Sequence, residues 1–310
     1  MQALVIGEAL VDIVQRPGAE PEVYPGGSPA NVAIGLARLG RDVQLLTWLG
    51  EDKYGDQVRH HLESSRVRIA SGSQRAERTS TAAATIADDG SATYDFDLTI
   101  DYPDHQVADD VVVVHLGSIG AVLQPGADKA AALIGSARHR AIITYDPNLR
   151  PSIMGSAAQV RECVLGLVAG ADVVKVSDED LAWFEPGKDP RDVARAWAAS
   201  GPALVVVTLG AEGSFATTAH GVEAEVPAPS VTVADTVGAG DSFMGGLIDG
   251  LWSTGLVGAD KHEAIAAVGP SVLLTLLGQA AAIAAITVSR PGANPPTRLE
   301  LLNAPGRDDA

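Results

Sequence analysis

Short apolar runs alternate with longer amphipathic segments along most of the chain. Runs such as 111–114 and 204–207 contain only valine and leucine, as expected for strands of a sheet covered on both faces. The apolar runs predict strands over residues 3–6, 43–48, 111–116, 141–145, 172–176 and 204–208. Apolar residues three and four positions apart predict helices over residues 29–39, 54–64, 126–138, 157–168 and 191–199, followed by two C-terminal helical stretches. This alternation predicts a doubly wound α/β fold with a mostly parallel sheet, formed by residues 1–310 as a single domain.

Two segments interrupt this alternation. Residues 11–24 separate the first strand from its helix, and residues 79–96 alternate around Asp88-Asp89-Gly90, which predicts a hairpin turn. A lone β-ribbon is unstable unless it packs against something else. We therefore expect a discontinuous β-lid, approximately residues 11–25 and 74–100, that covers a cleft or pairs with a second subunit.

A long uncharged stretch near the C-terminus requires a comparison with membrane helices. Residues 264–288 carry no charge over 25 positions, which is long enough to span a bilayer. However, Gly269-Pro270 and Gly278 interrupt the stretch, and alanine dominates where leucine and phenylalanine would be expected. We interpret it as a pair of buried helices in a soluble domain. The single cysteine, Cys163, excludes an internal disulfide, and the N-terminus lacks the basic region of a signal peptide, so we expect a cytoplasmic protein.

The overall charge excludes two classes of partner. The net charge is −17 and the sequence pI is near 4.7, so neither nucleic acid nor an anionic membrane would be attracted. For the same reason, an anionic substrate needs a local positive site. The apolar share of 46% in 310 residues is sufficient for a large α/β core.

The segment from Asp235 to Gly246 carries the clearest chemistry. Apolar residues at helical spacing follow it, so Gly238-Ala239-Gly240 lies at a helix N-terminus, where free N–H groups and the helix dipole bind anions. Asp241 beside such a site indicates a general base next to a transferring phosphoryl group. A glycine turn and a first-turn aspartate also occur for structural reasons alone. The segment lacks the Gly-Lys-Ser/Thr of a Walker loop, and Phe243 replaces the third glycine of a dinucleotide fingerprint.

A second motif covers residues 26–40. Ser28 suits an N-cap, Pro29 the first helical position, and Gly40 the end of the helix. Gly26-Gly27 permits close approach of a ligand to the backbone, and Asn31 in the first turn can point back towards that ligand. Alternatively, Asn31 caps its own helix.

Polar residues also follow one predicted strand after another. Ligands of open α/β sheets bind beyond the carboxyl ends of the strands. The segments that follow the strands are 8–12, 115–118, 146–150, 177–180 and 208–210, and together they predict a functional rim. Within this rim, Arg150 could supply a positive charge to phosphates or pair with a local acid at the surface.

Together the two motifs resemble the signatures of the ribokinase-like carbohydrate kinases, the PfkB family. Gly26-Gly27, Asn31-x-Ala33 and Leu39-Gly40 are similar to the first signature, and Asp235-Thr-x-Gly-Ala-Gly-Asp241 to the second, about 200 residues later. The resemblance covers essentially the whole chain. It implies an ATP-dependent kinase of a sugar-like alcohol, with a Rossmann-like three-layer α/β/α core and a β-lid through which a homodimer could form.

The resemblance also implies roles for individual residues. Asp241 would take the proton of the acceptor hydroxyl, with residues 237–240 as an anion hole for the γ-phosphate. The residues implied at the sugar are Asp12, Gly27 and Asn31, with Gly26 beside them, and those implied at ATP are Thr208, Gly210 and Gly213, together with Ser177, Gly238 and Gly240.

Metal ions are implied at two places. The segment from Ser177 to Asp180 stands where the family commonly has Asn-x-x-Glu, and it departs from that motif at both ends. Mg²⁺ would then be held mainly by ATP and water. Asp235, Val237 and the loop over residues 289–294 resemble the monovalent-cation site of some members, which implies K⁺.

The motifs also bear on the acceptor. Residues 7–13, 26–31, 115–118 and 146–150 are similar to fructokinases and 2-keto-3-deoxygluconate kinases, and we favour D-fructose. A keto acid would require a dedicated cation, for which Arg16, Arg75 and Arg78 are the candidates. With 4% aromatic residues, a nucleoside kinase is the weaker alternative. A non-catalytic sensor of a sugar or nucleotide is an alternative outside the enzymes, and the presence of Asp241 argues against it.

Overall fold

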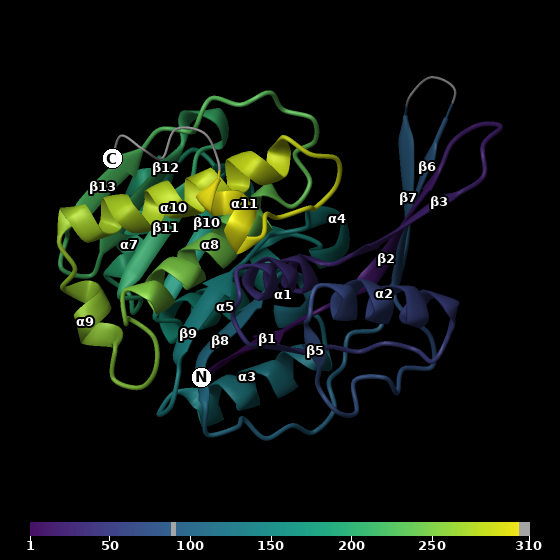
Figure 1. The fold of residues 1–310 in the computed structure, drawn as a ribbon, viewed down its shortest axis with the longest axis horizontal. Coiled ribbons are helices and arrows are strands. Elements are labelled where there is room, and N and C mark those ends of the chain that lie inside the picture. The colour runs from purple at the N-terminus through teal and green to yellow at the C-terminus, as the bar shows by residue number, and fades with distance from the viewer. Residues whose placement is uncertain (88–90, 304–310) are drawn as a thin grey trace.

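The computed structural model describes residues 1–87 and 91–303 (Figure 1). Its body is a nine-stranded sheet in the order β13-β12-β11-β10-β9-β8-β1-β4-β5, in which β12 and β13 run antiparallel and the other neighbours run parallel. These strands are β1 (Gln2–Ile6), β4 (Val43–Leu46), β5 (Arg68–Ile69), β8 (Val111–Gly117), β9 (Ile142–Asp146), β10 (Val173–Ser177), β11 (Leu204–Thr208), β12 (Ser214–Thr218) and β13 (Glu223–Val226). The predicted mostly parallel sheet is confirmed.

Helices cover both faces of this sheet. The helices are α1 (Ser28–Arg38), α2 (Lys53–Ser64), α3 (Gly126–Ala137), α4 (Pro151–Met154), α5 (Ala157–Gly170), α6 (Asp178–Phe184), α7 (Pro190–Ala198), α8 (Ala239–Ser253), α9 (His262–Ala266), α10 (Pro270–Val288) and α11 (Arg298–Leu302). The side chains of α1, α8 and α10 pack with Val113 and Val206 in one core cluster, and those of α3, α5 and α7 pack with Val114 and Val205 in another. Neighbouring residues of a strand face opposite sides, so the molecule has the three layers of the predicted fold.

A second, four-stranded sheet projects from one side of the body (Figure 1). Its order is β3-β2-β6-β7, with β2 at Leu10–Gln15, β3 at Glu22–Gly26, β6 at Thr81–Ile86 and β7 at Ala92–Asp97. β6 and β7 pair antiparallel up to Ile86 and Ala92. The predicted turn at Asp88-Asp89-Gly90 lies outside the described residues.

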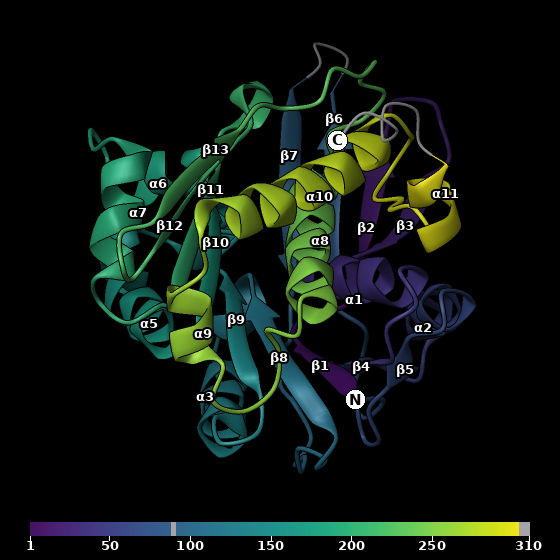
Figure 2. The ribbon, with the colours of Figure 1, turned by 60° about the vertical axis from the view of Figure 1, so that its left-hand side comes forward.

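The uncharged C-terminal stretch forms α9 and α10. Within the described residues, α10 is the one helix with the length and apolar composition needed to cross a membrane. It lies across α8 (Figure 2), and its residues Leu273 and Leu276 are fully buried there. At Gly246 of α8, an added Cβ would lie only 2.9 Å from the Cα of Ala280, so glycine and alanine allow close contact of the two helices. This explains the alanine-rich composition by packing within the body.

Candidate active site

The parallel strands bring most of the predicted polar segments to one edge of the sheet. β8, β9, β10 and β11 are consecutive neighbours, and Gly117 pairs with Asp146 where β8 and β9 end, as Ser177 does with Thr208 in β10 and β11. The prediction for His115 was wrong, because this residue lies inside β8 and is 1% exposed. Its Nδ1 is 3.0 Å from Thr144 Oγ1, and burial, together with Lys175, lowers its pKa to about 3.

The two sequence motifs meet at the carboxylate of Asp241. Ser28 Oγ donates a hydrogen bond of 2.6 Å to Asp241 Oδ1, and Asn31 Nδ2 donates one of 2.8 Å to Oδ2. The N-cap position of α1 belongs to Gly27, not to Ser28 as predicted, because the Ser28 hydroxyl is turned towards Asp241. Asp241 is only 9% exposed, so α1 holds its carboxylate in one orientation.

Gly27 and Gly26 allow the chain to pass close to neighbouring polar groups. Gly27 has φ 107°, and an added Cβ would lie 2.5 Å from the Glu8 carbonyl oxygen. An added Cβ on Gly26 would lie 2.2 Å from Asp12 Oδ2. Asp12 is an exposed residue of β2, and thus belongs to the projecting sheet, while Asn31 belongs to the body. The predicted sugar-binding residues therefore lie where the two sheets meet.

The N-terminus of α8 presents free donors. Gly238 has φ 75° and precedes the helix, whose first turn contains Gly240 and Asp241. The N–H groups of these two residues have no hydrogen-bond acceptor within the described residues. Such donors, with the positive end of the helix dipole, suit an anion.

A buried ion pair that the sequence analysis missed lies beside this turn. Lys175 Nζ is 3.0 Å from Asp146 Oδ2, and the two side chains are 4% and 1% exposed. The sequence contained one signal for it, a lysine within an otherwise apolar strand. Burial raises the pKa of Asp146 to about 6, although Lys175 acts to lower it.

The rim next to Asp146 has an unusual backbone. Ser118 has φ 56° and Asn148 has φ 38°, and Asn148 Nδ2 donates to Ser118 Oγ at 3.3 Å. Positive φ in non-glycine residues stores strain and clusters at functional sites. Glu8 is also buried at this rim, where it accepts a hydrogen bond of 3.0 Å from Gly120 N. Burial raises the pKa of Glu8 to about 7 against the opposing effect of this bond.

Arg150 acts on the pKa values of Glu8 and Asp12 but forms an ion pair with neither of them. In the described part of the chain it has no ion pair, and its guanidinium donates to the Leu149 carbonyl at 3.1 Å. Although Asp12 retains solvent contact, partial burial raises its pKa, and Arg150 acts to lower it. Arg150 was predicted either to supply a positive charge to phosphates or to pair with a local acid, and no such pair is found in the described residues.

The segment from Ser177 to Asp180 begins a helix. Ser177 caps α6 by accepting from Asp180 N at 3.0 Å, while Asp180 Oδ1 accepts from Leu149 N at 2.8 Å. Both carboxylate oxygens of Asp180 thus have backbone donors, since Oδ2 accepts from Ser177 N at 3.3 Å. This arrangement fixes the rim segment that contains Asn148 and Arg150.

The turn after β11 needs both of its predicted glycines. Thr208 ends the strand, Gly210 has φ 53°, and Gly213 has φ 114°. A Cβ on Gly213 would lie 2.0 Å from the Val226 carbonyl oxygen, so the turn packs closely on the end of β13. The turn therefore lies beside Ser177 on the same edge of the sheet.

Asp235 joins the second motif to the 289–294 loop. Its Oδ1 accepts from Val237 N at 3.0 Å and its Oδ2 from Gly292 N at 2.8 Å. These two bonds hold the pKa of Asp235 below its ordinary value. A Cβ on Gly238 would lie 2.6 Å from Ala293 Cβ, which places the loop directly against the turn.

Comparisons with known proteins give one consistent result. The family model for "pfkB family carbohydrate kinase" matches residues 2–299. The fructokinase of Rhizobium leguminosarum bv. trifolii is 35% identical over 261 residues, which cover 80% of this chain and 79% of that protein. Fructokinase of Xylella fastidiosa with bound ATP superposes with a TM-score of 0.81 at 27% identity, covering 97% of each chain. A double mutant of the Vibrio cholerae O395 fructokinase, bound to fructose, ADP and potassium, gives 0.77 at 26% identity, also covering 97% of each chain.

Proposed function

Because this chain belongs to the pfkB family of carbohydrate kinases, we propose that it is an ATP-dependent fructokinase. It transfers the γ-phosphoryl group of ATP to a terminal hydroxyl of D-fructose. The observation that carries this proposal is the junction of the two motifs, in which Ser28 and Asn31 orient Asp241 beside the free N–H groups of α8. The similarity to fructokinases supports D-fructose as the acceptor sugar.

The surroundings of Arg16, Arg75 and Arg78 favour a neutral sugar over a keto acid. Arg16 is paired with Glu22, and Arg78 Nε lies 2.8 Å from Asp97 Oδ2. Arg75 lines a surface cavity together with the acids Glu51 and Glu63. A substrate carboxylate would have to compete with these acids for the three arginines that the sequence analysis considered.

In the proposed reaction, Asp241 accepts the proton of the acceptor hydroxyl. An aspartate is a weak base, with an ordinary pKa of ~3.9, but phosphoryl transfer depends mainly on positioning and charge stabilisation. Ser28 and Asn31 hold the carboxylate, and the N–H groups of Gly240 and Asp241 stabilise negative charge on the transferred group. Asp12 and Gly26 of the projecting sheet and Gly27 and Asn31 at the start of α1 bind the sugar hydroxyls.

The rim residues would hold the nucleotide and ions. We assign Thr208, Gly210, Gly213 and Ser177 to ATP because they adjoin one another at the end of the sheet. ATP supplies the phosphoryl group, and Mg²⁺ bound to it offsets the phosphate charge. Within the described residues, no group of three acidic, histidine or cysteine side chains is placed to hold a metal, so ATP and water would hold the Mg²⁺. K⁺ would bind at the turn of Asp235 and Val237 against the 289–294 loop, and the unpaired Arg150 is available to phosphates.

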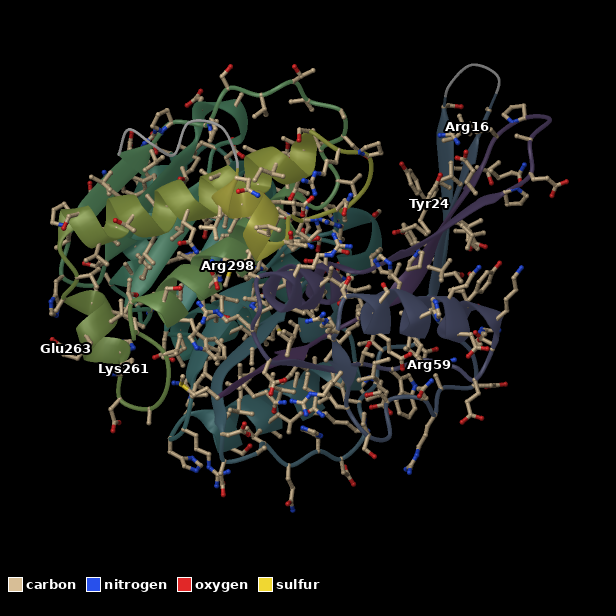
Figure 3. All side chains as sticks on the ribbon, viewed as in Figure 1. Arg16, Tyr24, Arg59, Lys261, Glu263 and Arg298 are labelled. Carbon is tan, nitrogen blue, oxygen red and sulfur yellow. The ribbon has the colours of Figure 1, made fainter. Side chains whose placement is uncertain are left out.

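The projecting sheet would act as the lid and as the surface of a homodimer. The proposed lid, over approximately residues 11–25 and 74–100, presents the side chains of Tyr24 (Figure 3) and Tyr94, which are 52% and 61% exposed. A lid that excludes water would protect ATP from hydrolysis. Size-exclusion chromatography with light scattering would test whether the protein is a dimer. Elution as a monomer at micromolar concentration would contradict the proposed dimer. We place the enzyme in the cytoplasm and expect neither nucleic acid nor membrane as a partner.

A coupled ADP-release assay over hexoses, pentoses, keto acids and nucleosides, with and without K⁺, tests the substrate. We expect fructose to give the highest kcat/KM, and brisk turnover of another class with negligible turnover of fructose would contradict the proposal. Asp241→Asn should lower kcat by about 10²–10⁴-fold, the usual contribution of a general base. The control is Asp42→Asn, an equal change of charge at an exposed ion pair with Arg68. If Asp241→Asn retains kcat within a few-fold, Asp241 is not the base.

A further inference from the structure

Lys175 is a charged residue in the middle of a strand that otherwise consists mostly of valine. Val174 and Val176 of β10 face the core under α5 and α7, while Val173 faces the core that contains α8. Alternation along the strand puts the Lys175 side chain on the side of Val173 and α8. Burying a lysine is costly, and this side chain is only 4% exposed. A hydrophobic residue would pack at this position without that cost.

The ammonium group of Lys175 lies against the first turn of α8. A Cβ on Gly240 would lie 2.9 Å from Lys175 Nζ, which is closer than Cβ contacts normally come. Gly240 does not have a positive φ, so its backbone would accept any residue. A side chain at position 240 would therefore have to displace the ammonium group of Lys175 from the first turn of α8.

Three carboxylates act on this single ammonium, of which Asp146 contacts it directly. Burial acts to lower the pKa of Lys175, but Asp146, Asp180 and Asp241 outweigh that effect and raise it. The lysine thus stays protonated at neutral pH. One positive charge against three acids leaves the cluster negative, at the place where the proposed function requires a polyphosphate.

The ion pair with Asp146 does not account for the lysine by itself. Asp146 Oδ1 is buried and has no hydrogen-bond partner in the described residues, while Oδ2 alone contacts Lys175. A buried pair that served only stability would be expected to satisfy both oxygens, since its desolvation cost is repaid only by complete hydrogen bonding.

We propose that Lys175 is a positioning residue for phosphoryl transfer. Its charge lies against Gly240 in the first turn of α8, adds to the dipole of that helix and offsets the three carboxylates. The γ-phosphoryl group is thereby drawn to the turn and held for the acceptor hydroxyl. This inference rests on the proposed kinase function.

The test removes both charges of the pair at once. Lys175→Met with Asp146→Asn keeps the volumes of the side chains, and replacing a buried ion pair by neutral groups of similar size is often neutral for stability. We expect the double variant to fold and to have a kcat about 100-fold lower, since loss of one preorganised group at a developing charge costs about 10²–10³ in kcat. The KM for fructose should change less than about threefold, because Lys175 and Asp146 make no hydrogen bond or ion pair with the predicted sugar residues in the described part of the chain. A kcat within about threefold of the wild type would show that the pair is only structural.

Binding measurements separate this inference from the proposed function. In calorimetric titrations without sugar, the double variant should bind ATP about tenfold more weakly than the wild type, and ADP less than about threefold more weakly, because the charge acts on the γ-phosphate. Equal weakening of both nucleotides would overturn the inference. A wild-type protein that binds ATP but phosphorylates no sugar would refute the fructokinase proposal, and the comparison of ATP with ADP would still test Lys175.

A second variant tests the same proposal if the double variant does not fold. Gly240→Ala keeps every charge and pushes on Lys175 Nζ, and should lower kcat by about tenfold or more. Gly245→Ala is the matched control in the same helix, because its Cβ would lie 3.7 Å from the Val32 carbonyl oxygen, an ordinary contact. The control should retain kcat within about twofold. Unchanged kcat in Gly240→Ala would overturn the inference.

Discussion

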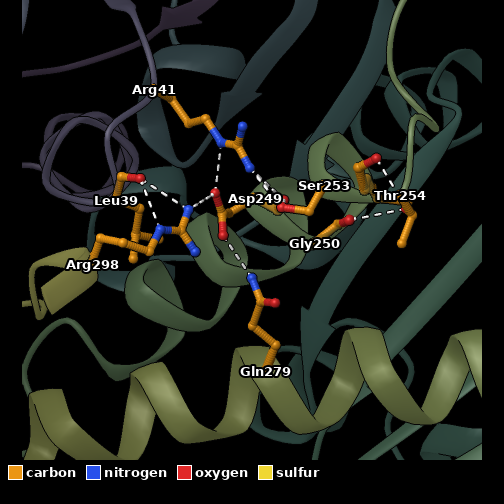
Figure 4. Close-up of polar contacts among 9 residues, drawn as sticks. Leu39, Arg41, Asp249, Gly250, Ser253, Thr254, Gln279 and Arg298 are labelled. Carbon is orange, nitrogen blue, oxygen red and sulfur yellow. Dashed lines mark hydrogen bonds and ion pairs between the residues drawn. The ribbon is translucent and has the colours of Figure 1, made fainter. Parts of the chain in front are cut away.

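Asp249 of α8 is the centre of a buried polar cluster whose removal should destabilise the protein without impairing the chemistry. The carboxylate is 0% exposed and accepts hydrogen bonds from Arg41 Nε at 2.6 Å, Arg298 Nη2 at 2.5 Å and Gln279 Nε2 at 2.6 Å (Figure 4). These donors come from the segment after α1, from α11 and from α10. One carboxylate therefore joins three separate parts of the chain to α8.

The magnitude follows from what Asp249→Asn leaves behind. Breaking a buried ion pair by removing one partner costs about 3–5 kcal/mol. The two arginine side chains are 19% and 36% exposed, so water can solvate them in part, and we expect the lower limit of about 3 kcal/mol. At roughly 2 °C per kcal/mol for a protein of this size, the melting temperature should fall by about 6 °C.

Differential scanning calorimetry with Asp42→Asn as control tests this reasoning. Asp42 forms an ion pair of 2.6 Å with Arg68, but both side chains are more than half exposed, so its loss should cost less than about 1 kcal/mol. Asp249 lies eight residues beyond Asp241, about 12 Å along the helix. The kcat of Asp249→Asn at 25 °C should therefore stay within about twofold of that of the wild type. Equal melting temperatures of the two variants would refute the analysis, and so would a large loss of kcat in Asp249→Asn below its melting transition.

Two further predictions concern the rim and the orientation of Asp241. Because burial raises the pKa of Glu8 from 4.5 to about 7, ionisation of Glu8 costs stability as the pH rises through this range. Glu8→Gln should therefore be no more stable than the wild type at pH 4.5 but about 3 kcal/mol more stable at pH 8. Urea unfolding that shows the same difference in stability at both pH values would contradict this prediction. Ser28→Ala removes a hydrogen bond to the charged Asp241, and such a bond contributes about 1.5–3 kcal/mol. In steady-state kinetics, kcat should therefore fall by about 10- to 100-fold with little change in the KM for fructose. A change in KM alone would show that Ser28 contacts the sugar instead.

The sequence predicted those parts of the fold that depend on local pattern. The valine runs of β8 and β11 identify strands buried on both faces, and the glycine motifs identify the starts of α1 and α8. β12 was missed because Ser-Phe-Ala-Thr-Thr contains little apolar sequence, and its complete burial arises only from the packing around it. Local composition carries no information on such tertiary burial.

The parts of the site that were missed depend on distant residues. Ser28 suited an N-cap by its position, and the hydroxyl instead serves Asp241, 213 residues later. Lys175 and Asp146 lie in different strands, so neither spacing nor motif joins them. His115 was placed at the rim because a polar residue near a strand end normally faces solvent, whereas Thr144 provides a buried partner. Long-range pairs of this kind are visible only after the sheet order is known.

The hydrogen bonds from α1 to Asp241 also bear on how the protein acquires its activity during synthesis. A nascent chain that has emerged from the ribosome only as far as residue 240 contains Ser28 and Asn31 but not the carboxylate to which they donate. With the role proposed for Asp241, such incomplete chains lack the general base. Contacts between such distant segments also delay completion of the native state, since closing long loops is slow.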